Sequence, residues 1–278
     1  MGSVRPGAYI VNRRREYSDM AFNPHVNGGG LVEDTAFVAE TAYVGLTAMV
    51  RDRAQVLDNA HIGGVSRISG NAVVGGDAQV DGRAQIHTNA CVKGSAFVGD
   101  DAQVGGSARV YGNARIYGFA VLEQESHGYG NAQIFGNASI NGKARIFDDA
   151  KVYGSSTIWN AKVFGKAEVY GSVEISDSVE IYGSAHICGD NPPSEEHLQW
   201  GWQCLSISGA AHVFGDARVY GTASVSDNVK VSGSSHVCGK AQIKHFAKIQ
   251  GTAIIRGDVI VGQYDVVIRG QLPVSKAY

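Results

Sequence analysis

The hydrophobic pattern of this chain has a period of six residues. From Val32 to Leu122 an aliphatic residue stands at every sixth position, usually with an alanine two positions before it. Glycine is common two positions after it, so the unit reads Ala-x-[Val/Ile]-x-Gly-x, as in 108–113. Alternating inward and outward residues are typical of a β-strand, and glycine beside Asn or Asp is typical of a turn. Each unit therefore predicts a strand of about four residues followed by a short turn.

Units this short predict a solenoid, because one strand cannot bury its apolar face whereas a stack of identical units can. The period breaks at Gly128, before Val163, where one residue is lost, and over 189–206. It resumes after each break, so we expect one elongated domain. The predicted parts are an N-terminal cap at 1–30, a β-solenoid over 31–270 with a loop insertion at 189–206, and a C-terminal tail at 271–278.

The repeat resembles that of the hexapeptide-repeat family, and Gly-Asn-Ala-Arg-Ile-Tyr at 112–117 is similar to YdcK-like and prophage-associated members. Many members place the glycine one position after the aliphatic residue, whereas this chain places it two positions after. The resemblance implies a left-handed, single-stranded parallel β-helix with a triangular cross-section, 18 residues per coil and about twelve coils. Left-handed crossovers depart from the usual rule, so the handedness is taken from the resemblance alone. The resemblance also implies a homotrimer.

Composition and charge argue against several classes of partner. The net charge of −2 gives no overall attraction to nucleic acid or to an anionic membrane, so we expect neither partner. No stretch is long and apolar enough to span a bilayer, and the N-terminus lacks the apolar core of a signal peptide. The four cysteines form no CxxC motif and no disulfide framework, which fits a reducing compartment. We therefore expect a cytoplasmic protein, or a virion-associated one if the chain derives from a phage.

The residue after each aliphatic position is predicted to point outward, and on two faces of the rod it is usually aromatic. Such columns protect stacked strands, but a long exposed apolar patch is uncommon on a monomer. We therefore favour a protein–protein interface over simple protection of the strands, with a second copy or another protein as the partner. The predicted columns are Tyr111, Tyr129, Phe147, Phe164, Tyr182 and Phe214 on one face, and Tyr117, Phe135, Tyr153, Tyr170, Cys188 and Tyr220 on the next. The third face is largely polar.

The insertion is a second candidate site, because it brings carboxylates, a histidine and two tryptophans onto one loop. Loops that leave a rigid scaffold often carry function. Glu196 and His197 could act as a general acid–base pair, and Trp200 and Trp202 could clamp a ligand. A loop whose tryptophans fold back on the rod accounts for the same residues, and we slightly favour it.

His127 is a further candidate, because it stands beside Glu123 and Glu125 at the break near Gly128. We favour an irregular coil there over a bulge with an acid–histidine pair. No histidine stands in a catalytic motif of the hexapeptide acyltransferases. No histidine pair has the spacing of the zinc carbonic anhydrase built on this fold, so no metal site is predicted.

Basic residues interleave with the aromatic ones on two faces of the predicted rod. Cations beside aromatic rings can bind nucleic acid or another polyanion. Because Glu168, Glu174 and Glu180 follow them, we favour a solvated surface of mixed charge. The basic series consists of Arg109, Arg115, Arg145, Lys151 and Lys162.

Two classes of function remain. A non-catalytic β-solenoid that serves as a scaffold, binding surface or assembly part needs no cofactor, and it fits a regular repeat without converging polar residues. The resemblance adds a phage or prophage setting for such a part. The alternative is an acyltransferase that uses acetyl-CoA or another acyl-CoA at a subunit interface near 189–206. A fold does not decide function, and we favour the non-catalytic rod.

Overall fold

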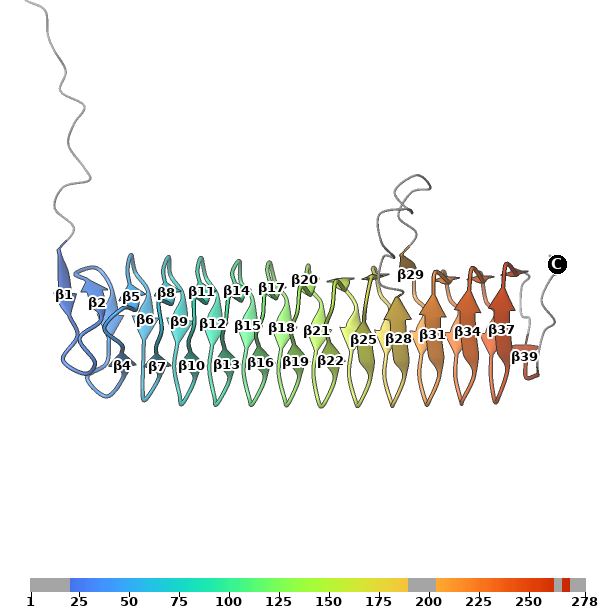
Figure 1. The fold of residues 1–278 in the computed structure, drawn as a ribbon, viewed down its shortest axis with the longest axis horizontal. Coiled ribbons are helices and arrows are strands. Elements are labelled where there is room, and N and C mark those ends of the chain that lie inside the picture. Colours follow the sequence, from blue (N-terminus) through green and yellow to red (C-terminus); the bar gives the residue numbers. More distant parts are fainter. Residues whose placement is uncertain (1–20, 190–203, 263–266, 271–278) are drawn as a thin grey trace, which may run out of the picture.

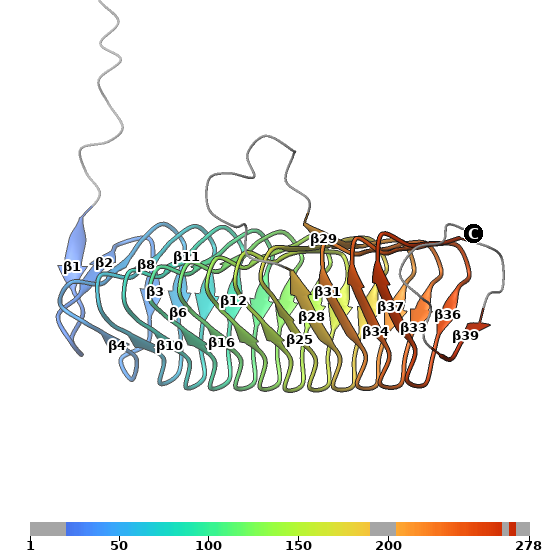
Figure 2. The same ribbon diagram turned by 45° about the vertical axis from the view of Figure 1, so that its right-hand side comes forward.

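The computed structural model describes residues 21–189, 204–262 and 267–270, and every regular element in these ranges is a β-strand. Three sheets run along an elongated rod, with 14, 13 and 12 strands (Figures 1 and 2). From β2 onward, consecutive strands belong to different sheets, and each strand pairs in parallel with the strand one coil away, as Gln79 does with Phe97. This confirms the predicted all-β parallel solenoid of about twelve coils with 18 residues per coil.

The strands are short, and each sheet takes one strand from nearly every coil. The first sheet contains β1 (Phe22–Pro24), β2 (Leu31–Glu33), β5 (Met49–Val50), β8 (Arg67–Ile68), β11 (Gln85–Ile86), β14 (Gln103–Val104), β17 (Val121–Leu122), β20 (Ser139–Asn141), β23 (Thr157–Trp159), β26 (Val173–Ile175), β29 (Leu205–Ile207), β32 (Ser224–Val225), β35 (Gln242–Ile243) and β38 (Ile260–Val261). The second sheet contains β3 (Phe37–Val38), β6 (Gln55–Val56), β9 (Val73–Val74), β12 (Cys91–Val92), β15 (Arg109–Val110), β18 (His127–Gly128), β21 (Arg145–Ile146), β24 (Lys162–Val163), β27 (Glu180–Ile181), β30 (His212–Val213), β33 (Lys230–Val231), β36 (Lys248–Ile249) and β39 (Val267–Ile268). The third sheet contains β4 (Tyr43–Val44), β7 (His61–Ile62), β10 (Gln79–Val80), β13 (Phe97–Val98), β16 (Arg115–Ile116), β19 (Gln133–Ile134), β22 (Lys151–Val152), β25 (Glu168–Tyr170), β28 (His186–Gly189), β31 (Arg218–Gly221), β34 (His236–Gly239) and β37 (Ile254–Gly257).

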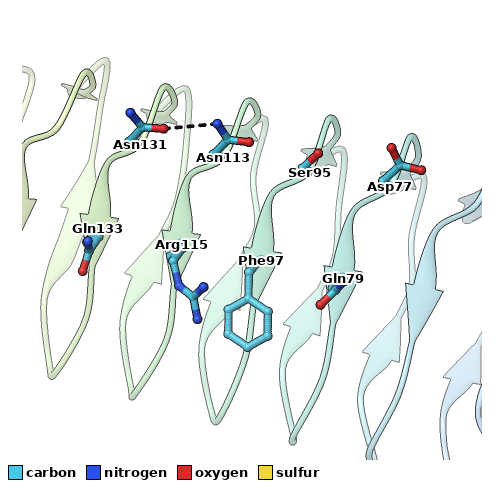
Figure 3. Close-up of a pocket in the computed structure, with 8 residues that line it drawn as sticks. All are labelled: Asp77, Gln79, Ser95, Phe97, Asn113, Arg115, Asn131 and Gln133. Atoms are coloured by element: carbon cyan, nitrogen blue, oxygen red, sulfur yellow. Dashed lines mark hydrogen bonds between the residues drawn. The ribbon is translucent and has the colours of Figure 1, made fainter.

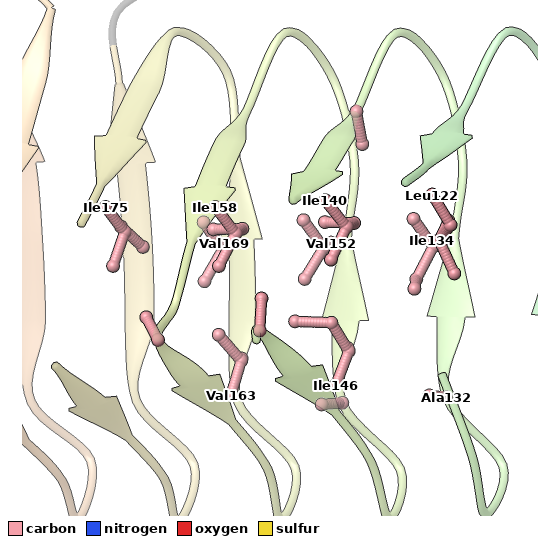
Figure 4. Close-up of a cluster of buried hydrophobic side chains, with 14 of the residues drawn as sticks. Leu122, Ala132, Ile134, Ile140, Ile146, Val152, Ile158, Val163, Val169 and Ile175 are labelled. Atoms are coloured by element: carbon pink, nitrogen blue, oxygen red, sulfur yellow. The ribbon is translucent and has the colours of Figure 1, made fainter. Parts of the chain in front are cut away.

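The core is a stack of aliphatic side chains enclosed by the three sheets (Figure 4). The alanine and the Val or Ile of each unit both point inward, as Ala108 and Val110 do with no exposed surface. Burial of one such Val or Ile side chain stabilises the fold by about 1.5–3 kcal/mol. The same contribution is repeated in every coil, which explains how strands of two residues hold their places.

The turns are stabilised by residues in the left-handed region of backbone conformation. Gly94 has a φ of 73°, and a Cβ on it would lie 3.0 Å from the backbone nitrogen of Gly112 in the next coil. Several coils carry aspartate at this position instead. The carboxylate then accepts a hydrogen bond from the backbone of the next turn, as Asp58 does from the N–H of Gly76 at 2.7 Å. This turn position is therefore occupied either by glycine, which has no Cβ to clash, or by aspartate, whose carboxylate bonds to the next turn.

The predicted break at Gly128 is a change of side chain and not of backbone. β18 keeps the parallel register with β15 and β21, so neither a bulge nor an irregular coil is present. The space where a Cβ would stand lies 3.4 Å from the Cδ1 atoms of both Ile116 and Ile134. These neighbouring side chains fill the position, and the expectation of an irregular coil was wrong.

The loss of one residue before Val163 is confirmed, and Asn160 compensates for it. Asn141 pairs with Trp159, 18 positions later, whereas Arg145 pairs with Lys162, only 17 positions later. Asn160 adopts a φ of 60°, and its side-chain oxygen accepts a hydrogen bond from the N–H of Lys143 at 2.8 Å. A side-chain amide thus replaces a backbone carbonyl, and the sheets continue without interruption.

The insertion leaves the pairing of the flanking strands intact. β26 pairs in parallel with β29, with Ile175 opposite Ile207. β28 likewise pairs with β31, with His186 opposite Arg218. The core columns therefore have the same order before and after the insertion.

At the N-terminal end, segments that do not follow the repeat cover two of the three sheet edges. β1 pairs with β2 in the antiparallel direction and forms the edge of the first sheet. The backbone groups of Asn27 and Gly30 bond to Val44 at the edge of the third sheet. Covered edges do not template pairing with another chain. Among the described residues, no helix is long and apolar enough to cross a membrane.

Candidate binding surfaces

Six aromatic rings form a continuous stack along the second sheet, which we call the first ladder. Neighbouring ring centroids lie 4.8–5.0 Å apart, and their planes are within 10° of parallel. The stack continues across the insertion, because Tyr182 lies against Phe214 at 5.0 Å. The rungs are Tyr111, Tyr129, Phe147, Phe164, Tyr182 and Phe214, the residues predicted for this face.

The second ladder is shorter and runs along the third sheet. Its rungs are Tyr117, Phe135, Tyr153 and Tyr170, with centroids 4.7–4.9 Å apart and planes within 4° of parallel. Cys188 takes the next rung, as the sequence indicates, so the ring stack ends there. Burial, together with a hydrogen bond to the Cys188 thiol, raises the pKa of Tyr170 to about 12.

The ladders present ring edges to the outside, because the faces of the rings cover one another. Most rungs are half-buried, whereas the end rung Tyr111 is 38% exposed. Burial also raises the pKa values of the Tyr129, Tyr153 and Tyr182 hydroxyls. These ladders are therefore rigid apolar ridges, and their interior rungs have no free faces on which a flat ligand could stack.

His127 lies on β18 between two arginines and not beside a hydrogen-bonded carboxylate. Its register partners are Arg109 on β15 and Arg145 on β21. Burial, then the charges of Arg145 and Arg109, lower its pKa below the ordinary value, and Glu125 only partly opposes this effect. Glu123 lies on the first sheet and faces His87 instead. The structure thus lowers the pKa of His127 and places no acid–histidine pair there.

The other predicted site residues lie outside the described ranges. These are Glu196, His197, Trp200 and Trp202 of the insertion. Their roles stay predictions.

Two carboxylates that follow the basic series form ion pairs with its last two members, Lys151 and Lys162. Glu168 accepts a hydrogen bond from Lys151 at 2.9 Å, and its other oxygen lies 3.7 Å from Nδ1 of His186. Exposed pairs of this kind each contribute about 0–1 kcal/mol. The same arrangement recurs on the second sheet for Lys162, Glu180 and His212, at 2.7 and 3.5 Å.

Sequence reasoning missed a shallow groove of about 570 Å³ on the outer face of the third sheet (Figure 3). The Arg115 guanidinium lies over the Phe97 ring, 4.9 Å from its centroid. The Asn113 amide donates a hydrogen bond to Asn131 at 3.1 Å along the adjoining corner. These residues precede the aliphatic positions or follow the turns, whereas the predicted columns contain only the residues after the aliphatic positions. The remaining lining residues are Asp77, Gln79, Ser95 and Gln133.

A second missed feature is a histidine–carboxylate pair that spans one whole coil. Nε2 of His87 lies 3.5 Å from a carboxylate oxygen of Glu123, two coils away. The residue between them is Gly105, where a Cβ would clash with the His87 ring. The glycine therefore leaves the space in which the two side chains meet. Among the described residues, no group of three or more His, Cys, Asp or Glu is placed to hold a metal ion.

Comparison with protein families gives one match, to the YdcK β-solenoid repeat, over residues 102–118 and 108–124. This stretch runs from β14 to β17 and holds Tyr111 and Tyr117, the first rungs of both ladders. No curated protein matches the chain. The same repeat continues on both sides of the matched residues in one parallel solenoid. The matched stretch therefore carries the YdcK β-solenoid repeat, and the parallel solenoid on both sides of it supports the resemblance to the hexapeptide-repeat family.

Proposed function

We propose that this chain is a non-catalytic β-solenoid rod that assembles with copies of itself, as a homotrimer, through its two aromatic ladders. The observation that carries the proposal is the unbroken first ladder, in which six parallel rings form one apolar ridge. Protection of the strands alone does not require aromatic rings at this position. Coils before Tyr111 carry Leu57, Gly75 and Lys93 there on the same sheet.

The rigidity of the ladders favours association. Each rung is fixed by its strand and by its stacked neighbours, so docking a partner costs little additional side-chain entropy. Aromatic residues are also enriched at the centres of protein interfaces. When a partner buries these rings, most of the hydrophobic free energy therefore goes into binding, because little side-chain entropy is lost.

Two different ladders on one protomer fit a cyclic assembly. If the first ladder of one copy contacts the second ladder of the next, the contact is heterologous, and it closes into a ring when the rotation between copies divides a full turn. In this arrangement the outer face of the first sheet, with Asn141 and Ser176 at the equivalent positions, faces solvent, and it is largely polar apart from Trp159. The number of three copies follows the resemblance to the hexapeptide-repeat family.

The test compares glutamate at equivalent positions on different faces. Phe135→Glu places a charge in the second ladder, and Ser176→Glu places the same charge on the polar face. We expect wild type and Ser176→Glu to be trimers by light scattering and Phe135→Glu to be a monomer with an unchanged circular dichroism spectrum. If Phe135→Glu does not fold, Tyr111→Ser at the exposed end rung replaces it. A folded ladder variant that keeps the wild-type mass contradicts the proposal.

The acyltransferase alternative is tested in the same preparation. Native mass spectrometry with acetyl-CoA is expected to show the protein without bound cofactor. Retention of acetyl-CoA by wild type and its loss in His197→Ala would replace the assembly role with a catalytic one.

A further inference from the structure

Three adjacent strands of the second sheet present basic side chains at the same outward position. Arg109 on β15 pairs with His127 on β18, and His127 pairs with Arg145 on β21. Neighbouring strands lie about 4.8 Å apart, so the two arginines flank the histidine across about 10 Å. The two guanidinium charges repel one another across the intervening histidine. This arrangement is therefore unfavourable unless something else compensates for it.

Elsewhere the chain compensates by placing a carboxylate in the next coil. Glu180 stands between Lys162 and His212, and Asp101 bonds to Arg83 at 2.6 Å. In the described part of the chain, Arg109 and Arg145 form no ion pair, and both side chains are exposed. The cations at this place are thus left unneutralised although the same fold neutralises others nearby.

The pKa of His127 responds to the positive charge of the two arginines. Its pKa is lowered by burial and then by Arg145 and Arg109, and the single opposing charge is that of Glu125 on the preceding corner. The Tyr111 ring meets the imidazole edge-on, with centroids 6.3 Å apart, and forms one wall of the surface. Near neutral pH the imidazole is uncharged between two guanidinium groups, ready to gain a proton when an anion arrives.

We propose that Arg109, His127 and Arg145 form a binding site for a tetrahedral oxyanion, a phosphate or sulfate group, free or carried on a larger molecule. Each guanidinium can donate two parallel hydrogen bonds to an oxyanion. A carboxylate has two oxygens and is filled by one such fork, whereas a tetrahedral dianion has oxygens for both forks and for the imidazole. The site needs a single protomer and does not rest on the proposed assembly.

The experiment follows the imidazole of His127 by NMR in the full-length protein, with His127→Gln used to assign its signal. Sulfate is added at constant ionic strength against chloride, because sulfate does not itself titrate in this range. Sulfate is expected to raise the pKa of His127, and to bind more tightly as the pH falls. Arg145→Gln is expected to weaken binding about tenfold, as for loss of one charge-assisted hydrogen bond, and so is Arg109→Gln. Lys151→Gln removes the same charge from the neighbouring sheet and should leave binding unchanged.

A second experiment distinguishes a site for a single free anion from a site for a larger molecule that carries several anionic groups. If tripolyphosphate binds no more tightly than inorganic phosphate, the site takes a single anionic group. If tripolyphosphate binds tenfold more tightly or better, the natural ligand is a polyanion that extends along the sheet. The proposal is overturned if sulfate shifts His127 no more than chloride does. It is also overturned if Lys151→Gln weakens binding as much as Arg145→Gln.

Discussion

Two stretches of the second sheet share a backbone, a core and an aromatic ladder, yet their charges are arranged in opposite ways. β15, β18 and β21 present basic side chains only, whereas β24, β27 and β30 present a carboxylate between two partners. Rings of the first ladder stand beside both stretches. The repeat thus fixes the inward positions, and the two stretches also share the ladder. The outward residue before each aliphatic position differs between them at little cost to the fold. The outward residues compared are Arg109, His127 and Arg145 against Lys162, Glu180 and His212.

The largest expected effect tests whether the two stretches share an equivalent core. Ile146→Ala and Ile181→Ala each remove a fully buried side chain next to Arg145 and Glu180. Each is expected to lower the free energy of unfolding by about 2–5 kcal/mol, because the rigid coils cannot close the cavity. Urea denaturation followed by circular dichroism measures both. A large loss in one variant and almost none in the other would show that the stretches differ inside as well as outside.

A smaller effect is expected from exchanging the two charge patterns. Glu180→Gln leaves Lys162 and His212 without their carboxylate and should cost about 0.5–1 kcal/mol after allowance for solvent screening. His127→Glu places a carboxylate between two arginines and should stabilise by a similar amount. Thermal unfolding at low and high salt measures both changes, which should shrink together as salt rises. Changes of the same sign in the two variants would contradict the comparison.

The smallest effect concerns pH and belongs to the unpaired stretch alone. Because the pKa of His127 is lowered in the folded chain, the unfolded chain takes up a proton first as the pH falls. The contribution of His127 is therefore present above about pH 6.5 and is lost as the pH falls below it. Wild type should lose more thermal stability between pH 7.5 and 5.5 than His127→Asn. An equal or greater loss in the variant would show that His127 does not experience this field.

The fold could be predicted from the sequence because one period repeats in nearly every coil. An alanine and a Val or Ile two positions apart point to the same side of the chain, and the structure buries both. The way in which the structure accommodates irregular positions of the repeat could not be predicted from the sequence. Gly128 looked like a break because the sequence pattern lacks an aliphatic residue there. In the structure, the side chains of the neighbouring isoleucines fill the space that it leaves. The role of Asn160 likewise depends on a turn conformation that the repeat does not specify.

The surface was predictable only in part. The ladders follow from an 18-residue repeat of aromatic residues, and the structure shows the rings stacked as expected. Which cations stay unpaired depends on how far side chains reach between coils. His87 and Glu123 meet over two coils because Gly105 leaves a gap, which no spacing rule anticipates. The groove around Arg115 was missed because it combines strand and corner positions.

The proposed assembly through the ladders is tested most directly by the mass of the native particle. Native mass spectrometry of the wild-type protein is expected to give three times the 29.3 kDa mass of the chain. Hydrogen exchange in the same sample should show protection at the ladder strands β19 and β22 beyond that of the corresponding first-sheet strands. A particle of 29.3 kDa at all concentrations would contradict the account, because the ladders would then be ridges that protect a solitary rod.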